Sequence, residues 1–393
     1  MNFKKILSCF LALLILFPNY FIEASCVDIN TNQTQKEIIF VTDEKIIIDS
    51  VAISNYFSEE KAKDLCFVKP DENSENILSK ELFPNGSPKP EDIQQGNLGM
   101  CYFLAVLSTV AEKDPKLLMR NLVDDGNGNI IVKFFNPNNG KPFYIKVQKT
   151  VPKLADEYKF LKNDCLWVHM YLKAFVASGF AGNYGGLSAN CAKSYKNVEG
   201  GFMHVAIRMI TGKESKIKNA ASIFLSNKNK LYDEFKFILS NNGYICCDFT
   251  SHLNIVKLLF GKLMINGIVR KHSYSVEKVY EDKEGQRWIV IRNPWNFYTA
   301  TYDEKGKRIK NSEDNNGYST LKWEDFLSEC GRVEYSIDEP IKTRSIFKRF
   351  MDFIDPIPYT IRVLEYLLIN KGMELSIIRI GNLIGLNTTI ESA

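Results

Sequence analysis

One cysteine stands where a thiol can do chemistry, in the stretch QQGNLGMCYF at residues 94–103. Gly96 and Gly99 permit a tight turn, and an apolar run follows directly after Cys101. We expect a helix to begin at this cysteine, where unpaired N–H groups and the positive dipole end stabilise a thiolate. The thiol pKa is then predicted to fall below its free value of about 8.5. Cys101 is either a nucleophile or a small apolar residue at the start of a buried helix.

Gln95 can supply a second polar group near that thiol. It lies upstream of Cys101 across the glycine-spaced turn, so its side-chain NH₂ group can approach the Cys101 backbone N–H. Two donors that converge on one point stabilise the negative charge that develops on a carbonyl oxygen during acyl transfer. Gln95 is therefore a candidate oxyanion-hole residue.

A cysteine nucleophile needs a base, and the chain contains four histidines. His169 and His204 lie in apolar helical runs, and His252 lies at a predicted helix start, so we expect structural roles for these three. His272 begins the alternating stretch HSYSVEKVYE, which predicts a strand. At the start of a strand at a sheet edge, His272 can face a cleft and serve as the base.

The stretch IVIRNPWN supplies a group that can orient the imidazole. Asn293 ends a predicted strand, which Pro294 prevents from simply continuing. If the two strands joined by EDKEGQ are antiparallel neighbours, Asn293 lies beside His272 and can hydrogen-bond to its ring. Trp295 can then cover that bond and exclude water. The order of glutamine, cysteine, histidine and asparagine carries more weight than any one of them.

These segments resemble those of the calpain-like cysteine proteases. QGNLGMCYFLA resembles the nucleophile segment of that family, HSYSV its histidine segment and IRNPW its asparagine segment. Weaker similarity is seen in LWVHMYLKAF, VEGGFMHVAIRMITG and LKWEDFLSECGRVEY. Together these stretches fall within residues 85–337.

The resemblance implies a papain-type, two-lobed thiol endopeptidase that acts on protein or peptide substrates through a thioester. It implies that Cys101 is the nucleophile, His272 the acid and base, and Asn293 the orienting residue. It further implies that Gln95 is an oxyanion donor and that Trp295 covers the triad.

The distribution of predicted elements favours an α+β fold. Helical patterns dominate residues 85–239, apart from a hairpin at NIIVKFF and PFYIKVQKTV, and strand-like runs dominate residues 240–340. We expect these halves to be the two lobes of one catalytic core, 85–340. The remaining segments are predicted to be a signal peptide (1–25), an N-terminal extension or pro-segment (26–84) and a basic amphipathic helical tail (341–393).

Both ends of the chain carry targeting or surface patterns. Lys4 and Lys5 precede a short apolar run and small residues, which predicts a cleaved export signal and a secreted or periplasmic protein. Lipid attachment at Cys26 is a less favoured hypothesis, because Glu23 stands where such a signal needs an apolar residue. The tail can either lie on a membrane surface or pack on the core.

Composition excludes several other classes. Fifty basic and forty-six acidic residues give a net charge of only +4, which does not favour binding to nucleic acid. The nine cysteines include no CxxC pair, so we expect no zinc site and no cofactor.

Calcium dependence is not favoured either. Asp92 stands where the family places a calcium ligand, but Gly185 replaces an expected glutamate and the loop after Trp295 lacks most acidic ligands.

Two other functions stay open. One is a transglutaminase-like or deamidating enzyme, which uses a similar cysteine and histidine but more often an aspartate as the third group. The other is a catalytically inactive secreted binding protein. Asn293 favours hydrolysis over the first, and the complete set of candidate residues disfavours the second.

Overall fold

The computed structural model describes residues 74–76, 81–126, 128–152, 165–178, 180, 199–219, 222–223, 226–249, 264–313 and 315–344. The predicted signal peptide, most of the predicted N-terminal extension and the tail beyond residue 344 lie outside the described residues, as do Cys26, Gly185 and His252. No helix among the described residues has the length and apolar character needed to cross a membrane. The predicted domain boundaries stay predictions.

The first lobe is built around helix α4 (Cys101–Lys113), whose side chains are all buried from Tyr102 to Ala111. This burial is expected for a run that is apolar almost all round. Phe103 stacks on Phe175 with ring centroids 4.0 Å apart. The other elements of this lobe are η2 (Pro90–Asp92), α5 (Pro115–Arg120), α6 (Leu166–Ala177), α7 (Met203–Thr211) and an antiparallel sheet of β2 (Leu122–Asp124), β3 (Asn129–Phe135) and β4 (Pro142–Gln148).

The second lobe is built on a six-stranded antiparallel sheet with the order β14-β11-β10-β7-β15-β6. Its strands are β6 (Lys213–Asn219), β7 (Ile245–Asp248), β10 (Ser273–Glu281), β11 (Arg287–Arg292), β14 (Tyr318–Lys322) and β15 (Arg332–Pro340). Helices α9 (Lys228–Ser240) and α11 (Trp323–Glu329) contribute Phe235, Trp323 and Phe326 to a second aromatic core.

Three short antiparallel strand pairs complete the described elements. They are β1 (Ser74–Asn76) with β5 (Thr150–Pro152), β8 (Met264–Ile265) with β9 (Ile268–Val269), and β12 (Ala300–Tyr302) with β13 (Arg308–Lys310). The α+β fold class predicted from the sequence is confirmed, and so is the hairpin of β3 and β4.

One strand was not predicted, and one expectation about the strands is wrong. Residues 213–219 lie in the part of the chain where helical patterns dominate, yet they form β6 and pair with β15. His272 was expected at a sheet edge, but β10 lies inside the sheet between β11 and β7. His272 instead precedes the first residue of β10, at the end of a strand rather than along an edge.

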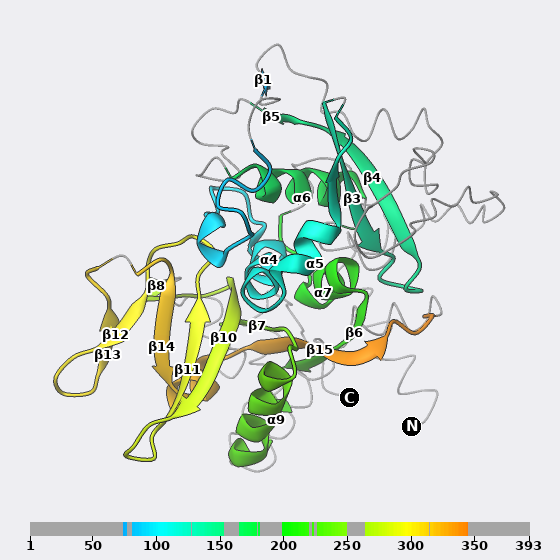
Figure 1. Cartoon of the computed structure of the whole chain (residues 1–393). Coiled ribbons are helices and arrows are strands. Elements are labelled where there is room, and N and C mark those ends of the chain that lie inside the picture. The colour runs from blue at the N-terminus through cyan, green and yellow to red at the C-terminus, as the bar shows by residue number, and fades with distance from the viewer. Residues whose placement is uncertain are drawn as a thin grey trace, which may run out of the picture.

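Helix α4 lies where the two lobes meet. It contacts α7 of the first lobe and both β10 and β7 of the second (Figure 1). Ser108 of this helix meets Ser275 of β10, with the two hydroxyl oxygens 3.3 Å apart. The helix that begins with Cys101 is therefore also the surface against which the second lobe packs.

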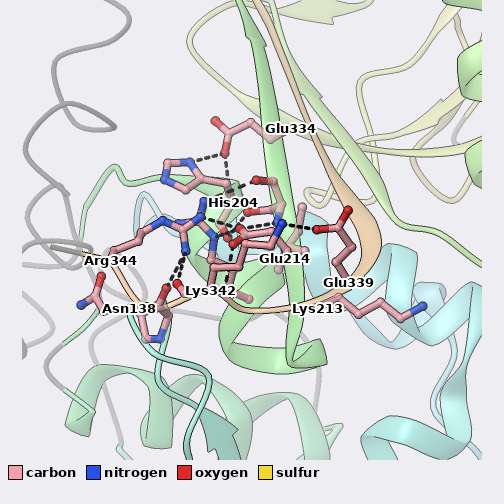
Figure 2. A network of polar contacts seen from close by, with 12 residues as sticks. Asn138, His204, Lys213, Glu214, Glu334, Glu339, Lys342 and Arg344 are labelled. Carbon is pink, nitrogen blue, oxygen red and sulfur yellow. Dashed lines mark hydrogen bonds and ion pairs between the residues drawn. The ribbon is translucent and has the colours of Figure 1, made fainter. Parts of the chain in front are cut away.

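A second polar network also joins elements of the two lobes (Figure 2). The Glu334 carboxylate of β15 accepts from the backbone N–H of His204 and lies 2.8 Å from the Nδ1 of that histidine. Glu214 of β6 pairs with Arg208 at 3.0 Å and with Arg344 at 2.5 Å. Burial alone would raise the pKa of Glu214, but these two arginines hold it at about 2. Arg344, at the end of the described chain, is therefore anchored to the core.

Candidate active site

Cys101 occupies the first position of α4, as predicted, and its sulfur lies against the second lobe. The backbone N–H and hydroxyl of Ser273 and the N–H of Tyr102 lie where they favour the thiolate and so act to lower the pKa of Cys101. Cys101 keeps partial exposure, whereas Ser273 and Tyr102 are buried. Because Ser273 directly follows His272, the sulfur lies beside the residue next to the candidate base.

The predicted lowering of the Cys101 pKa is wrong for this arrangement. Burial of the sulfur raises the pKa above 9.0, and the three donors only partly offset that effect. Asp248 raises it further through its negative charge, although an ion pair with Arg332 at 3.0 Å moderates that charge. Desolvation of an anion outweighs the helix N-terminus here, so the resting thiol is neutral.

The imidazole of His272 is buried and held by Asn293. Its Nε2 lies 2.8 Å from Asn293 Oδ1, which confirms the predicted juxtaposition of the two side chains. The ring also packs on Trp295 at 4.5 Å and on Tyr274 at 5.2 Å between centroids. Burial lowers the pKa of His272 to about 4, although the bond to Asn293 opposes that shift. The resting imidazole is therefore neutral.

The hydrogen bonds of Asn293 identify the tautomer of this imidazole. The Asn293 Nδ2 donates to the carbonyl oxygens of Phe297 at 2.9 Å and Tyr298 at 3.3 Å. Its Oδ1 accepts from the N–H of Trp295 at 3.0 Å. Since Oδ1 can only accept, His272 Nε2 must carry the proton that the 2.8 Å bond requires. Nδ1 is left with its lone pair, as a base needs.

The backbone around Asn293 explains why this loop has a fixed shape. The Asn293 N–H donates to the carbonyl of Gly317 at 2.8 Å. Gly317 has a φ of +82°, and a Cβ at this position would collide with the Asn293 carbonyl oxygen. Only glycine allows this close approach, so Gly317 supports the orienting residue from behind.

Gln95 is buried, and it connects the loop before Cys101 to the loop that holds Asn293. Its backbone N–H donates to the Pro294 carbonyl at 2.8 Å. Its side-chain Nε2 donates to the Leu98 carbonyl at 2.7 Å. A primary amide has two N–H donors, so this bond sets the orientation of the amide and leaves the second donor for another acceptor.

The structure thus gathers the candidate residues from three segments. Cys101 reaches Ser273, His272 binds Asn293, and the residue after Asn293 binds Gln95. The other described histidines lie elsewhere: His169 is in α6, and His204 at the start of α7 pairs with Glu334.

Two neighbours of the thiol were not found in the sequence. Ser273 carries only the signal that it follows His272. Asp248 carries no signal, because it reaches the site only through the pairing of β7 with β10, where it lies opposite Ser273. Strand register places it there, and a pattern read within one strand does not contain that information.

We expect the resting thiol to react slowly with iodoacetamide at neutral pH, because only the thiolate is nucleophilic and its pKa is raised above 9.0. The rate of Cys101 labelling, followed by mass spectrometry of the intact protein and its peptides, should still be rising with pH above the range in which an ordinary thiol has ionised. Cys246 and Cys247 are fully buried with thiol pKa values raised well above 9.0, and they serve as internal controls. A rate already at its plateau in mild acid would show a preformed thiolate and contradict this expectation.

Two known proteins can be compared with this chain. The calpain-type cysteine protease DEK1 of Arabidopsis thaliana is 24% identical over an alignment of 273 residues that covers 63% of this chain. The chain spans only 11% of the length of that protein. The crystal structure of SERA5E from Plasmodium falciparum is 12% identical and covers 67% of this chain and 96% of its own, with a TM-score of 0.26. A TM-score that low supports no conclusion.

The family model for calpain family cysteine proteases matches residues 41–325, which is most of the chain. This range includes Gln95, Cys101, His272 and Asn293. The resemblance predicted from the three short motifs is therefore confirmed at the level of the family. The chain belongs to the calpain family of cysteine proteases.

Proposed function

We propose that the protein is a cysteine endopeptidase that hydrolyses peptide bonds in protein or peptide substrates. Cys101 is the nucleophile, His272 the acid and base, and Asn293 the residue that orients the imidazole. The observation that carries this proposal is the 2.8 Å bond from His272 Nε2 to Asn293 Oδ1, because it leaves Nδ1 as the basic atom. The second support is the contact of the Cys101 sulfur with Ser273, next to that histidine.

The neutral resting state determines how the thiol is activated. Since the pKa of Cys101 is raised and that of His272 is lowered to about 4, no ion pair forms before substrate binds. His272 Nδ1 therefore removes the thiol proton as the sulfur attacks the scissile carbonyl carbon. The resulting imidazolium donates that proton to the leaving amine, and a thioester remains. Water, deprotonated by the same Nδ1, hydrolyses the thioester and regenerates the thiol.

The remaining candidate residues stabilise and shield these steps. The backbone N–H of Cys101 is at the first position of a helix, where it has no intrahelical acceptor, and it can point at a developing oxyanion. The second N–H of the Gln95 amide is the partner donor. Trp295 packs on the His272 ring and keeps water from the bond to Asn293.

We expect Cys101→Ser and His272→Ala to lower peptide hydrolysis by about 10⁴-fold or more, because nucleophile and base act as one unit. Cys165→Ser and His169→Ala are matched controls. Cys165 is also a partly exposed cysteine at a helix start, and His169 is partly buried in the same helix. The measurement is release of new N-termini from a casein digest, with labelling of Cys101 by a thiol-directed epoxide.

The same assay separates the two alternatives. Incorporation of an added amine, or loss of ammonia from glutamine without chain cleavage, would replace the protease with a transglutaminase-like or deamidating enzyme. Absence of both activities together with absence of epoxide labelling would indicate an inactive binding protein. Labelling that persists in His272→Ala would contradict the role of this histidine.

We propose that catalysis does not depend on calcium. The residues present do not fit the calcium site that the family suggests, because the Asp92 carboxylate is already used by protein donors. Its Oδ2 accepts from Trp167 Nε1 at 2.9 Å and from the Lys89 N–H at 3.0 Å. Its Oδ1 accepts from Asn85 Nδ2 at 3.1 Å, and the residue is buried.

Peptide hydrolysis is therefore expected to proceed at the same rate in EGTA as in added calcium. Initial rates of casein cleavage measure this at matched ionic strength, with magnesium in place of calcium as the control for a general divalent-ion effect. Activity that is lost in EGTA and restored by calcium, but not by magnesium, would show a calcium requirement.

We also propose that the protein is exported after removal of residues 1–25. The support is the basic start, the short apolar run and the small residues near the cut. Secreted or periplasmic protein recovered from the native cell is expected to begin near Cys26, as N-terminal sequencing determines. Recovery of the chain with its original N-terminus in the cytoplasm would contradict export.

A further inference from the structure

Arg292 is a fully buried arginine at the end of β11, directly before Asn293. Its guanidinium makes four hydrogen bonds. Nη2 donates to the Ile93 carbonyl at 2.9 Å and to Asn296 Oδ1 at 2.8 Å. Nε donates to the Asn316 carbonyl at 3.0 Å, and Nη1 donates to the Ser108 hydroxyl at 3.3 Å.

The partners of this guanidinium belong to the segments that carry the candidate catalytic groups. Ile93 lies two residues before Gln95, and Asn296 directly follows Trp295. Ser108 belongs to α4, the helix that begins with Cys101. One cation therefore contacts three segments at the same time. They are the loop that holds Gln95, the loop that holds Asn293 and helix α4.

Two further hydrogen bonds link residues near Gln95 to the strand ends near Asn293 in the described part of the chain. The Gln95 N–H donates to the Pro294 carbonyl, and the Tyr318 hydroxyl donates to Glu91 at 2.8 Å. Neither link reaches α4. Arg292 is suited to a three-way junction, because its planar guanidinium presents five donors in fixed directions.

The bonding of Arg292 also differs from that of comparable arginines in the described part of the chain. All four of its hydrogen bonds go to uncharged oxygens, whereas Arg308 binds the Glu329 carboxylate with Nη2 at 2.8 and 2.9 Å. Burying a cation is costly, and a carboxylate partner would offset more of that cost. Burial accordingly lowers the pKa of Arg292 despite nearby Tyr318, Glu277, Glu91 and Asp92. This arrangement fixes the positions of the groups that Arg292 binds, and it does so at a cost to the stability of the fold.

We propose that Arg292 is a positioning residue that holds the Gln95 loop and the Asn293 loop in register with helix α4. This inference rests on the proposed protease function. Arg292 acts through Gln95 and Asn293 and does not touch the thiol. The oxyanion donors and the imidazole are thereby kept at fixed positions relative to the attacking sulfur.

Loss of the guanidinium has a defined consequence for catalysis. The Ile93 and Asn316 carbonyls lose their donor, and the two loops can shift relative to the helix. A displacement of about 1 Å at a catalytic group costs about 100-fold in rate. The immediate surroundings of the Cys101 sulfur, Ser273 and Tyr102, do not include Arg292, so the thiol pKa should not change.

The test compares Arg292→Met with Arg308→Met, a second buried arginine in the same lobe that contacts none of the catalytic segments. We expect Arg292→Met to lower kcat for peptide hydrolysis about 100-fold, with KM nearly unchanged. Its pH profile of iodoacetamide labelling at Cys101 should match that of the wild type. Arg308→Met should keep the wild-type kcat even if its unfolding temperature falls.

A milder pair of variants addresses the case in which Arg292→Met does not fold. Asn296 and Asn316 both have positive φ, of 67° and 45°, so glycine fits either backbone without strain. Asn296→Gly removes a side-chain acceptor of Arg292, whereas Asn316→Gly keeps the carbonyl that Arg292 uses. We expect about a tenfold fall in kcat for Asn296→Gly and none for Asn316→Gly.

The outcomes separate this inference from the proposed function. A folded Arg292→Met with wild-type kcat, or Asn296→Gly indistinguishable from Asn316→Gly, overturns the positioning role alone. So does a fall in kcat that Arg308→Met shares equally. A wild-type protein that does not hydrolyse peptides overturns the proposed function, and the inference falls with it.

Discussion

The hydrogen bond between His272 and Asn293 determines what the candidate site can do. Its length of 2.8 Å and the two carbonyls bound by the Asn293 amide fix which nitrogen carries the proton. The other nitrogen is then a base at rest. The loop that holds Asn293 depends in turn on Gly317, where any side chain would displace the asparagine. The residues at the end of β11 and at the start of β14 therefore support one tautomer of the His272 imidazole.

Burial sets the electrostatics of the thiol and the imidazole together. Desolvation disfavours the charged form of each, so it raises the pKa of Cys101 and lowers that of His272 to about 4. Both effects oppose a resting thiolate and imidazolium pair. In the proposed mechanism, charge develops only when substrate binds, and the helix N-terminus can then stabilise it.

Helix α4 gives the site its dependence on both lobes. It begins with the candidate nucleophile Cys101, contributes most of its side chains to the first core and packs against β10 of the second lobe. Arg292 and the Ser108 to Ser275 contact cross the same boundary. Such contacts matter for the candidate site, because Cys101 begins a helix of the first core and His272 precedes a strand of the second.

The sequence alone determined the parts of this protein that depend on local pattern. The apolar run after Cys101 specified a buried helix that starts at the cysteine. The alternating stretches around EDKEGQ specified a hairpin that brings His272 beside Asn293, because two antiparallel strands with a short turn have a narrow choice of register. Three short motifs in order were enough to indicate the family.

Only the tertiary structure decided the rest. The neighbours of the thiol come from the pairing of β7 with β10, the strand β6 from its pairing with β15, and the junction at Arg292 from the packing of two lobes. The sign of the Cys101 pKa shift depends on how much protein surrounds the sulfur. These are contacts between residues far apart in the chain, and local residue patterns do not encode which distant surfaces meet.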